Sequence, residues 1–178
     1  MTAPLRVVVA VDDVVVPAAF ARTVDRLAQT AGVTLSVRLS PGAPPAHRRR
    51  GLSRLTDVVQ RAVYRPTVDA MAPVDLGLSH GELVDRSTGQ AELGDGADVV
   101  LDLTTDGLAP ADGGHPPLGV WSLRFGRDRR RLGAGAFESE YLSGSTVGSC
   151  ELVAELDTED PAEQVRVLYH SVGGVDPH

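Results

Sequence analysis

Short runs of apolar residues alternate along the chain with segments of helical periodicity. The run over residues 5–12 is almost continuously apolar, as in a strand buried on both faces of a parallel sheet. Apolar residues then recur at helical spacing over residues 21–31, with Pro17 expected in the first turn and Gly32 as the C-cap. Residues 33–39 alternate as a second strand. This order predicts a βαβ unit at the start of the chain.

The rest of the chain continues the alternation. Further strands are expected at residues 83–84, 97–103, 118–123, 147–156 and 165–171, and helical segments at 52–63 and 137–142. Strands that alternate with helices in one short chain predict a three-layer arrangement. We therefore expect one α/β domain over residues 1–178, with a Rossmann-like, twisted and mostly parallel sheet flanked by helices.

The composition narrows the class of protein. No apolar run reaches the roughly 20 residues that span a bilayer, and the N-terminus lacks the features of a secretion signal. The single cysteine, Cys150, excludes an internal disulfide framework and a cysteine-based zinc site. None of the five histidines has metalloprotease-type spacing, so no metal site is expected. We expect a cytoplasmic protein that does not bind membranes.

The charge balance disfavours nucleic acid as a partner. The formal net charge is −7, and every basic residue is arginine because the chain contains no lysine. Isoleucine and asparagine are also absent, which indicates a GC-biased and hence bacterial gene. Without lysine, neither a Schiff-base nucleophile nor a P-loop cation is available.

Ligands of parallel α/β sheets bind beyond the carboxyl ends of the strands. The strand ends to consider are residues 12–13, 103–106 and 122–128. Within them, Leu103 and Thr104 are candidate cofactor-binding residues.

Several other polar residues favour structural roles. Asp12 and Asp13 are interpreted as helix N-caps rather than functional carboxylates. Asp102 lies within a strand pattern, and its burial would require a partner such as an arginine, so a structural ion pair is expected. Cys150 is interpreted as a buried, inert thiol.

Three stretches occur in an order that resembles a known family. Residues 118–126 read Leu-Gly-Val-Trp-Ser-Leu-Arg-Phe-Gly, residues 133–138 read Gly-Ala-Gly-Ala-Phe-Glu, and residues 144–150 read Gly-Ser-Thr-Val-Gly-Ser-Cys. Together they resemble the formyltransferases that use 10-formyltetrahydrofolate, in particular a bacterial branch. The resemblance implies the Rossmann-like domain of that family, 10-formyltetrahydrofolate as a possible cofactor, and one-carbon transfer as the parent activity.

The family's catalytic residues are an Asn-x-His pair and a later aspartate. Carried over by position, they fall on Ser122, Arg124 and Asp157, while a second histidine of the branch falls on Phe125. Serine can still donate a hydrogen bond to an oxyanion. Arginine cannot act as a base near neutral pH, and phenylalanine cannot transfer protons. The resemblance therefore implies a scaffold whose usual triad has been lost.

A basic cluster accompanies this altered site. Arg124, Arg127 and residues 129–131 present guanidinium groups suited to a carboxylate or phosphate, although surface charge runs are more often merely solvated. Gly135 lies in the glycine-rich stretch, which we interpret as the start of a helix that would favour an anion. His115 is the only histidine placed to replace the missing base, although an exposed loop histidine is the alternative.

Three functions follow as hypotheses. The leading one is a formyltransferase-like pseudoenzyme that binds a folate-like or other anionic small molecule. The second is an active one-carbon or acyl transferase with altered catalytic residues. The third is a non-catalytic subunit in a biosynthetic pathway, acting as a homodimer or with a protein partner.

Overall fold

The computed structural model describes residues 3–40, 72–79, 84–85, 96–104, 107–108, 115–126, 128–131, 147–158, 160 and 162–174. The strands of its main sheet are β1 (Leu5–Val11), β3 (Val33–Leu39), β5 (Val84–Asp85), β6 (Val99–Asp102), β7 (Val120–Phe125), β8 (Arg130–Arg131), β9 (Val147–Glu155) and β10 (Val165–Gly174). A separate antiparallel pair joins β2 (Val15–Pro17) to β4 (Pro73–Asp75). The helices are α1 (Ala18–Ala28) and the single turn α3 (Leu76–Ser79).

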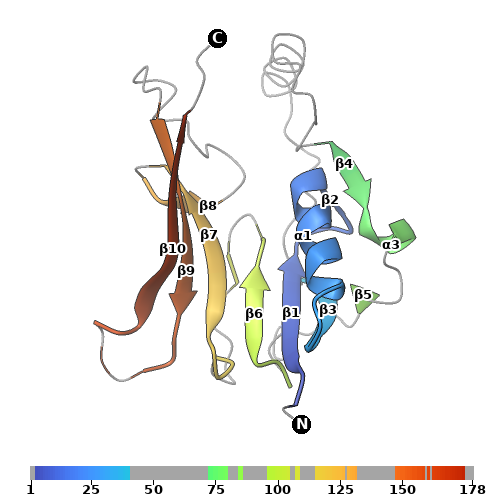
Figure 1. The fold of residues 1–178 in the computed structure, drawn as a ribbon, viewed down its shortest axis with the longest axis horizontal. Coiled ribbons are helices and arrows are strands. Elements are labelled where there is room, and N and C mark those ends of the chain that lie inside the picture. The colour runs from blue at the N-terminus through green and yellow to red at the C-terminus, as the bar shows by residue number, and fades with distance from the viewer. Residues whose placement is uncertain are drawn as a thin grey trace.

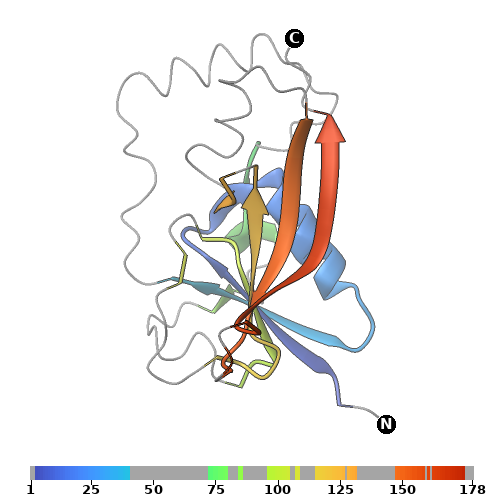
Figure 2. The same ribbon diagram turned by 90° about the vertical axis from the view of Figure 1, so that its left-hand side faces the viewer.

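The main sheet is mixed, with a parallel core. Its strand order is β10-β9-β7-β6-β1-β3-β5, and β8 pairs with β7. Strands β5, β3, β1, β6 and β7 are parallel, whereas β9 runs antiparallel to both β7 and β10. Figure 1 shows β9 and β10 at one side of the molecule and α1 at the other. In Figure 2, β9 and β10 cross the direction of β1 and β3 at a wide angle, which is the twist expected of such a sheet.

Strand β1 lies at the centre of the sheet and is buried on both faces. Val7, Val9 and Val11 belong to the main apolar cluster, while Val8 and Ala10 point to a second cluster on the opposite face. This two-sided burial explains why the run is continuously apolar rather than alternating.

Helix α1 covers the first of these faces. Phe20, Ala21 and Val24 are its buried residues, and all three join the cluster formed by the valines of β1. Because these residues lie at helical spacing, they form one apolar stripe that packs on the sheet. The predicted strand–helix–strand unit at the start of the chain is confirmed.

Helix α1 begins later than predicted, because a short strand precedes it. Residues 15–17 form β2, and Pro17 is the N-cap residue rather than part of the first turn. Asp13 accordingly does not cap the helix; its Oδ1 accepts a hydrogen bond from the Val15 amide at 3.2 Å in a local turn. Valine-rich segments favour extended backbone, and residues 15–17 accordingly form a strand that pairs with β4.

The predicted C-cap was also misplaced. Helix α1 ends with Gln29 as the C-cap, and Gly32 lies further along, with a φ of 81°. Gly32 therefore supplies the left-handed turn that leads into β3. Its carbonyl accepts the Leu5 amide, which fixes β3 beside β1.

The other strand predictions agree with the structure to within a few residues. Strands β6, β7, β9 and β10 lie where strands were expected, and β5 occupies residues 84–85. The short elements β2, β4, β8 and α3 were not predicted. The helices expected at 52–63 and 137–142 lie outside the described residues. Among the described residues, α1 is the one helix longer than a single turn, and it packs on one face of the sheet. No helix in the described ranges is both long enough and apolar enough to cross a membrane.

A glycine before β7 tests the packing of this sheet. Gly119 has a φ of 81°, and a Cβ at this position would collide with the Glu155 carbonyl oxygen on β9. We expect Gly119→Ala to lower the free energy of unfolding by about 2 kcal/mol or more, because it combines left-handed backbone strain with a backbone clash. Urea unfolding measures the effect. In the control Gly173→Ala, the new Cβ meets no atom within 4 Å, and stability should not fall. Equal losses in both variants would contradict the described β7–β9 packing.

Candidate functional site

The candidate site lies where the carboxyl ends of β1, β6 and β7 meet. The chain passes from β1 through α1 to β3 on one side, while β6 pairs with the other side of β1. This is a topological switch point, the position at which open α/β sheets form ligand crevices. A small pocket here is lined by Phe20, Asp102, Leu103, Thr104, Leu123 and Arg131.

Asp102, the last residue of β6, anchors the site. The residue is 3% exposed, and its carboxylate accepts hydrogen bonds from several donors. The Thr104 amide and hydroxyl donate to Oδ1 at 2.9 and 2.6 Å, and the Leu108 amide donates to Oδ2 at 3.1 Å. Arg131 completes the set with an ion pair to Oδ2. The ion pair that the sequence predicted for Asp102 is therefore present.

Arg131 reaches Asp102 because β8 folds back along β7. Arg131 is the Cα partner of Arg124 in this hairpin, and its side chain is 14% exposed. The guanidinium packs against Gly107, where a Cβ would lie 2.8 Å from Cζ. Gly107 also has a φ of 87°, so both its conformation and the nearby guanidinium require glycine.

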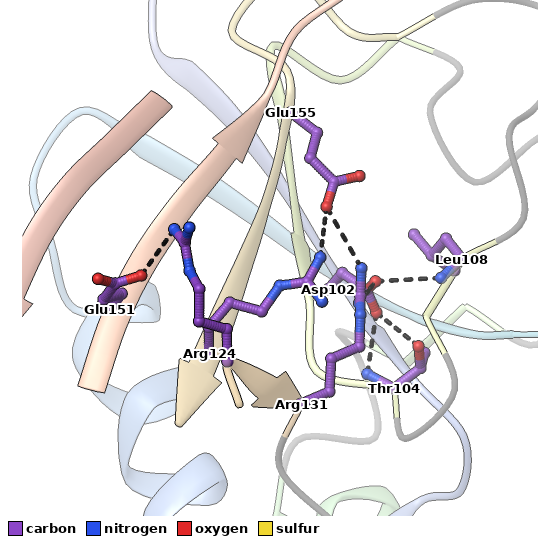
Figure 3. A network of polar contacts seen from close by, with 8 residues as sticks. Asp102, Thr104, Leu108, Arg124, Arg131, Glu151 and Glu155 are labelled. Atoms are coloured by element: carbon purple, nitrogen blue, oxygen red, sulfur yellow. Dashed lines mark hydrogen bonds and ion pairs between the residues drawn. The ribbon is translucent and has the colours of Figure 1, made fainter. Parts of the chain in front are cut away.

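Arg124 belongs to the same network. Its Nη2 donates to Glu155 Oε1 at 2.6 Å, and Arg131 Nη2 lies 3.6 Å from the same oxygen. Figure 3 shows both guanidinium groups directed at Glu155, while Arg131 also meets Asp102. Two arginines thus share two carboxylates, and the formal charges of these four side chains cancel.

A third ion pair lies at the margin of this network. Arg129 Nη2 is 2.7 Å from Glu151 Oε2, although the alignment does not meet hydrogen-bond geometry. The Arg129 side chain is largely exposed, so solvent screens the pair. Three arginines of the predicted basic cluster are thus matched by carboxylates.

Ser122 lies on β7 two residues before Arg124, on the same face of the strand. It is fully buried, and its Oγ has no hydrogen-bond partner. Residues 120, 122 and 124 share one face of β7, and Glu155 stands opposite Val120 rather than Arg124. The Arg124 side chain must therefore run back along β7, past Ser122, to meet Glu155.

Two predicted catalytic residues lie outside β7, near its amino end. Asp157 is exposed and follows β9 two residues after Glu155, beside the amino end of β7. His115 precedes β7 and lies at the same end, since the Leu118 amide bonds the Asp98 carbonyl before β6. The structure thus brings Ser122 and Arg124 together but places Asp157 and His115 at the opposite edge of the sheet.

Two of the four predicted cofactor-binding residues lie at the site, and the other two lie outside the described residues. Leu103 and Thr104 are buried and line the small pocket at the carboxyl edge. Arg127 and Gly135 lie outside the described residues. In the described part of the chain, no group of three His, Cys, Asp or Glu side chains could hold a metal ion.

Cys150 does not contribute a reactive thiolate. Burial raises the pKa of its thiol above the usual value, and the neighbouring Glu151 carboxylate raises it further. The side chain is half-buried rather than buried as predicted, but the thiol stays protonated at neutral pH.

Sequence reasoning missed Glu155, Glu151 and the buried role of Arg131. The available signal was the alternation Glu151–Val153–Glu155, which places two carboxylates on one strand face. Pairing this strand with β7 places them on the same face as Arg124.

Two buried hydroxyls in this site allow a matched prediction. Thr104 Oγ1 donates to a buried carboxylate, whereas Ser122 Oγ donates to nothing. We expect Thr104→Val to lower the free energy of unfolding by about 1.5–3 kcal/mol, because Asp102 loses a charge-assisted bond. Ser122→Ala should cost nothing or raise stability by up to about 1 kcal/mol. Thermal unfolding of both variants provides the measurement, and a larger loss for Ser122→Ala would contradict the described hydrogen bonding.

Two comparisons of the chain with known proteins give no match. No protein-family model matches it, and a search of the curated proteins finds no match. The strand pairing itself shows a mixed, mostly parallel α/β sheet.

Proposed function

We propose that the protein is a formyltransferase-like pseudoenzyme that binds a folate-like or other anionic small molecule at the carboxyl edge of β6 and β7. Two independent lines support the location. The sheet has its switch point there, and the small pocket lined by Asp102, Thr104 and Arg131 opens at the same edge. The ligand class follows from the sequence resemblance and from two arginines: Arg131 lines this pocket, and Arg124 pairs with the same glutamate as Arg131.

One observation carries the proposal. The position at which the resemblance places the catalytic histidine holds Arg124, and its guanidinium is 2.6 Å from Glu155. An arginine guanidinium is too weak an acid to lose its proton and serve as a base, and it cannot accept a proton from an attacking amine at neutral pH. It can bind an anion through its fork of N–H donors. The site is therefore suited to binding, without the proton transfer of formyl-group chemistry.

A relocated base is not favoured. Strand β7 begins at Val120, and His115 lies five residues before it, at the amino end of the strand, whereas Arg124 lies near the carboxyl end. General-base catalysis requires hydrogen-bond reach, directly or through one water. We therefore do not propose an active transferase that uses His115.

Calorimetric titration with 5-formyltetrahydrofolate tests the proposal. We expect saturable binding to the full chain and no formyl transfer from 10-formyltetrahydrofolate. Arg124→Ala should weaken binding about tenfold, which corresponds to one charge-assisted hydrogen bond. Arg129→Ala, which removes an exposed arginine from the neighbouring pair, is the charge-matched control and should bind like the unmodified chain. Absence of binding, or equal weakening in both variants, would overturn the proposed function.

A second candidate, a non-catalytic subunit, is favoured by strand β10. This strand is terminal in the described sheet, has no acidic residue, and exposes Val165, Val167, Leu168, Tyr169 and Val172 by 41–61%. Long apolar edge strands pair with other chains unless they are protected. We propose that a second copy supplies the partner, because its β10 offers an edge of equal length and equal apolar character, and antiparallel pairing closes a two-fold dimer.

Sedimentation equilibrium tests this dimer. Tyr169→Lys should raise the dimer dissociation constant at least about tenfold, since it places a charge at the paired edge and removes an aromatic contact. Gln164→Lys adds the same charge just outside β10 and should leave the dimer intact. A monomer at all concentrations would exclude the second-copy interface.

A further inference from the structure

Glu155 is the member of the arginine network that solvent reaches most easily. Its side chain is 32% exposed and that of Arg124 is 26% exposed, whereas the Asp102 side chain is fully buried. Glu155 Oε1 receives both guanidinium groups, at 2.6 Å from Arg124 and 3.6 Å from Arg131. Its carboxylate can therefore rotate into water while the rest of the network stays in place.

We propose that Glu155 is an internal substitute for a ligand carboxylate, and that the ligand binds by displacing it from Arg124 and Arg131. The inference rests on the proposed function, because it names the ligand class and the autoinhibition of that site. In Figure 3 the Glu155 carboxylate lies where both guanidinium groups can reach it. A ligand carboxylate presents the same two oxygens to the same donors.

Arg131 keeps its other side-chain contacts when Glu155 leaves, and Arg124 keeps its backbone position in the sheet. Arg131 remains paired with the buried Asp102 and packed against Gly107. Arg124 is held in the sheet as the Cα partner of both Arg131 and Glu151. Preorganised donors avoid much of the ordering cost of binding.

The local charge selects a monoanion. With Glu155 turned away, Asp102 contributes one negative charge and the two arginines contribute two positive charges, leaving a formal charge of +1. One ligand carboxylate restores neutrality. A phosphate dianion would leave the site with an excess negative charge beside the buried Asp102, which is unfavourable because like charges repel.

Ser122 supplies an independent observation that points to a ligand. Its Oγ is completely buried and lacks a partner, on the face of β7 that Arg124 crosses. A buried polar atom without a hydrogen bond is costly, so a ligand oxygen accepting from Ser122 gains a donor that the free protein leaves unused. The Glu155 carboxylate does not accept from Ser122 Oγ, so a ligand that uses all three donors must place an oxygen closer to Ser122 than Glu155 does.

Nuclear magnetic resonance titration of the ¹⁵N-labelled full chain tests the proposal. The probe is propanoate, which reproduces the end of a glutamate side chain, and the readouts are the Nε–H signals of Arg124 and Arg131. We expect Glu155→Gln to bind propanoate about fivefold more tightly, because the competing charge is removed. Glu163→Gln removes the same charge from an exposed turn and should bind like the unmodified chain.

A second variant tests the donor set. Ser122→Ala in the Glu155→Gln background should weaken propanoate binding about threefold to fivefold, the loss of one hydrogen bond. Thermal unfolding of each variant confirms that it is folded, and Glu155→Asp provides a further variant in which the competing charge is kept on a shorter side chain.

The outcomes separate the two proposals. If Glu155→Gln gives no tighter binding than Glu163→Gln, or chloride moves the arginine signals as propanoate does, the displacement mechanism is wrong. Tighter binding of inorganic phosphate than of propanoate overturns the carboxylate assignment. If 5-formyltetrahydrofolate still shifts the amides of Leu103 and Thr104, the proposed function stands without the displacement mechanism. If 5-formyltetrahydrofolate shifts none of these signals, the proposed function itself fails.

Discussion

The buried carboxylate of Asp102 is the constraint on which the carboxyl edge of the sheet depends. A charge in this position is tolerated only when donors surround it. The chain meets that requirement with a turn through Thr104, an amide from Leu108, and the β8 hairpin that returns Arg131 along β7. Local backbone, loop and hairpin are thus fixed by one side chain, and breaking the pair would leave an uncompensated buried charge.

The same constraint determines what the altered site can do. Arg131 pairs with Asp102, and Glu155 bridges Arg131 to Arg124, so the Arg124 side chain is engaged in ion pairing. An arginine cannot accept a proton near neutral pH, but its guanidinium donors lie beside a small pocket. Binding of a carboxylate is the chemistry that such a set retains.

Much of the sheet followed from the sequence because burial on two faces leaves a continuous apolar run, as in β1 and β6. The short β2 strand was missed because its partner β4 lies almost sixty residues away, and local periodicity carries no information on such pairing. At the site, the need for an arginine beside Asp102 was predictable from burial. The identity of Arg131, and the link to Glu155, depended on strand register that only the folded chain sets.

A double-mutant cycle on Asp102 and Arg131 tests the central role of this pair most directly. Asp102→Leu and Arg131→Leu, singly and together, are compared by urea unfolding. The structure predicts that each single substitution lowers the free energy of unfolding by about 3–5 kcal/mol. The double variant should recover most of this loss, because two buried leucines leave no unpaired charge. Additive losses would show that the two side chains do not depend on each other, and would contradict the account.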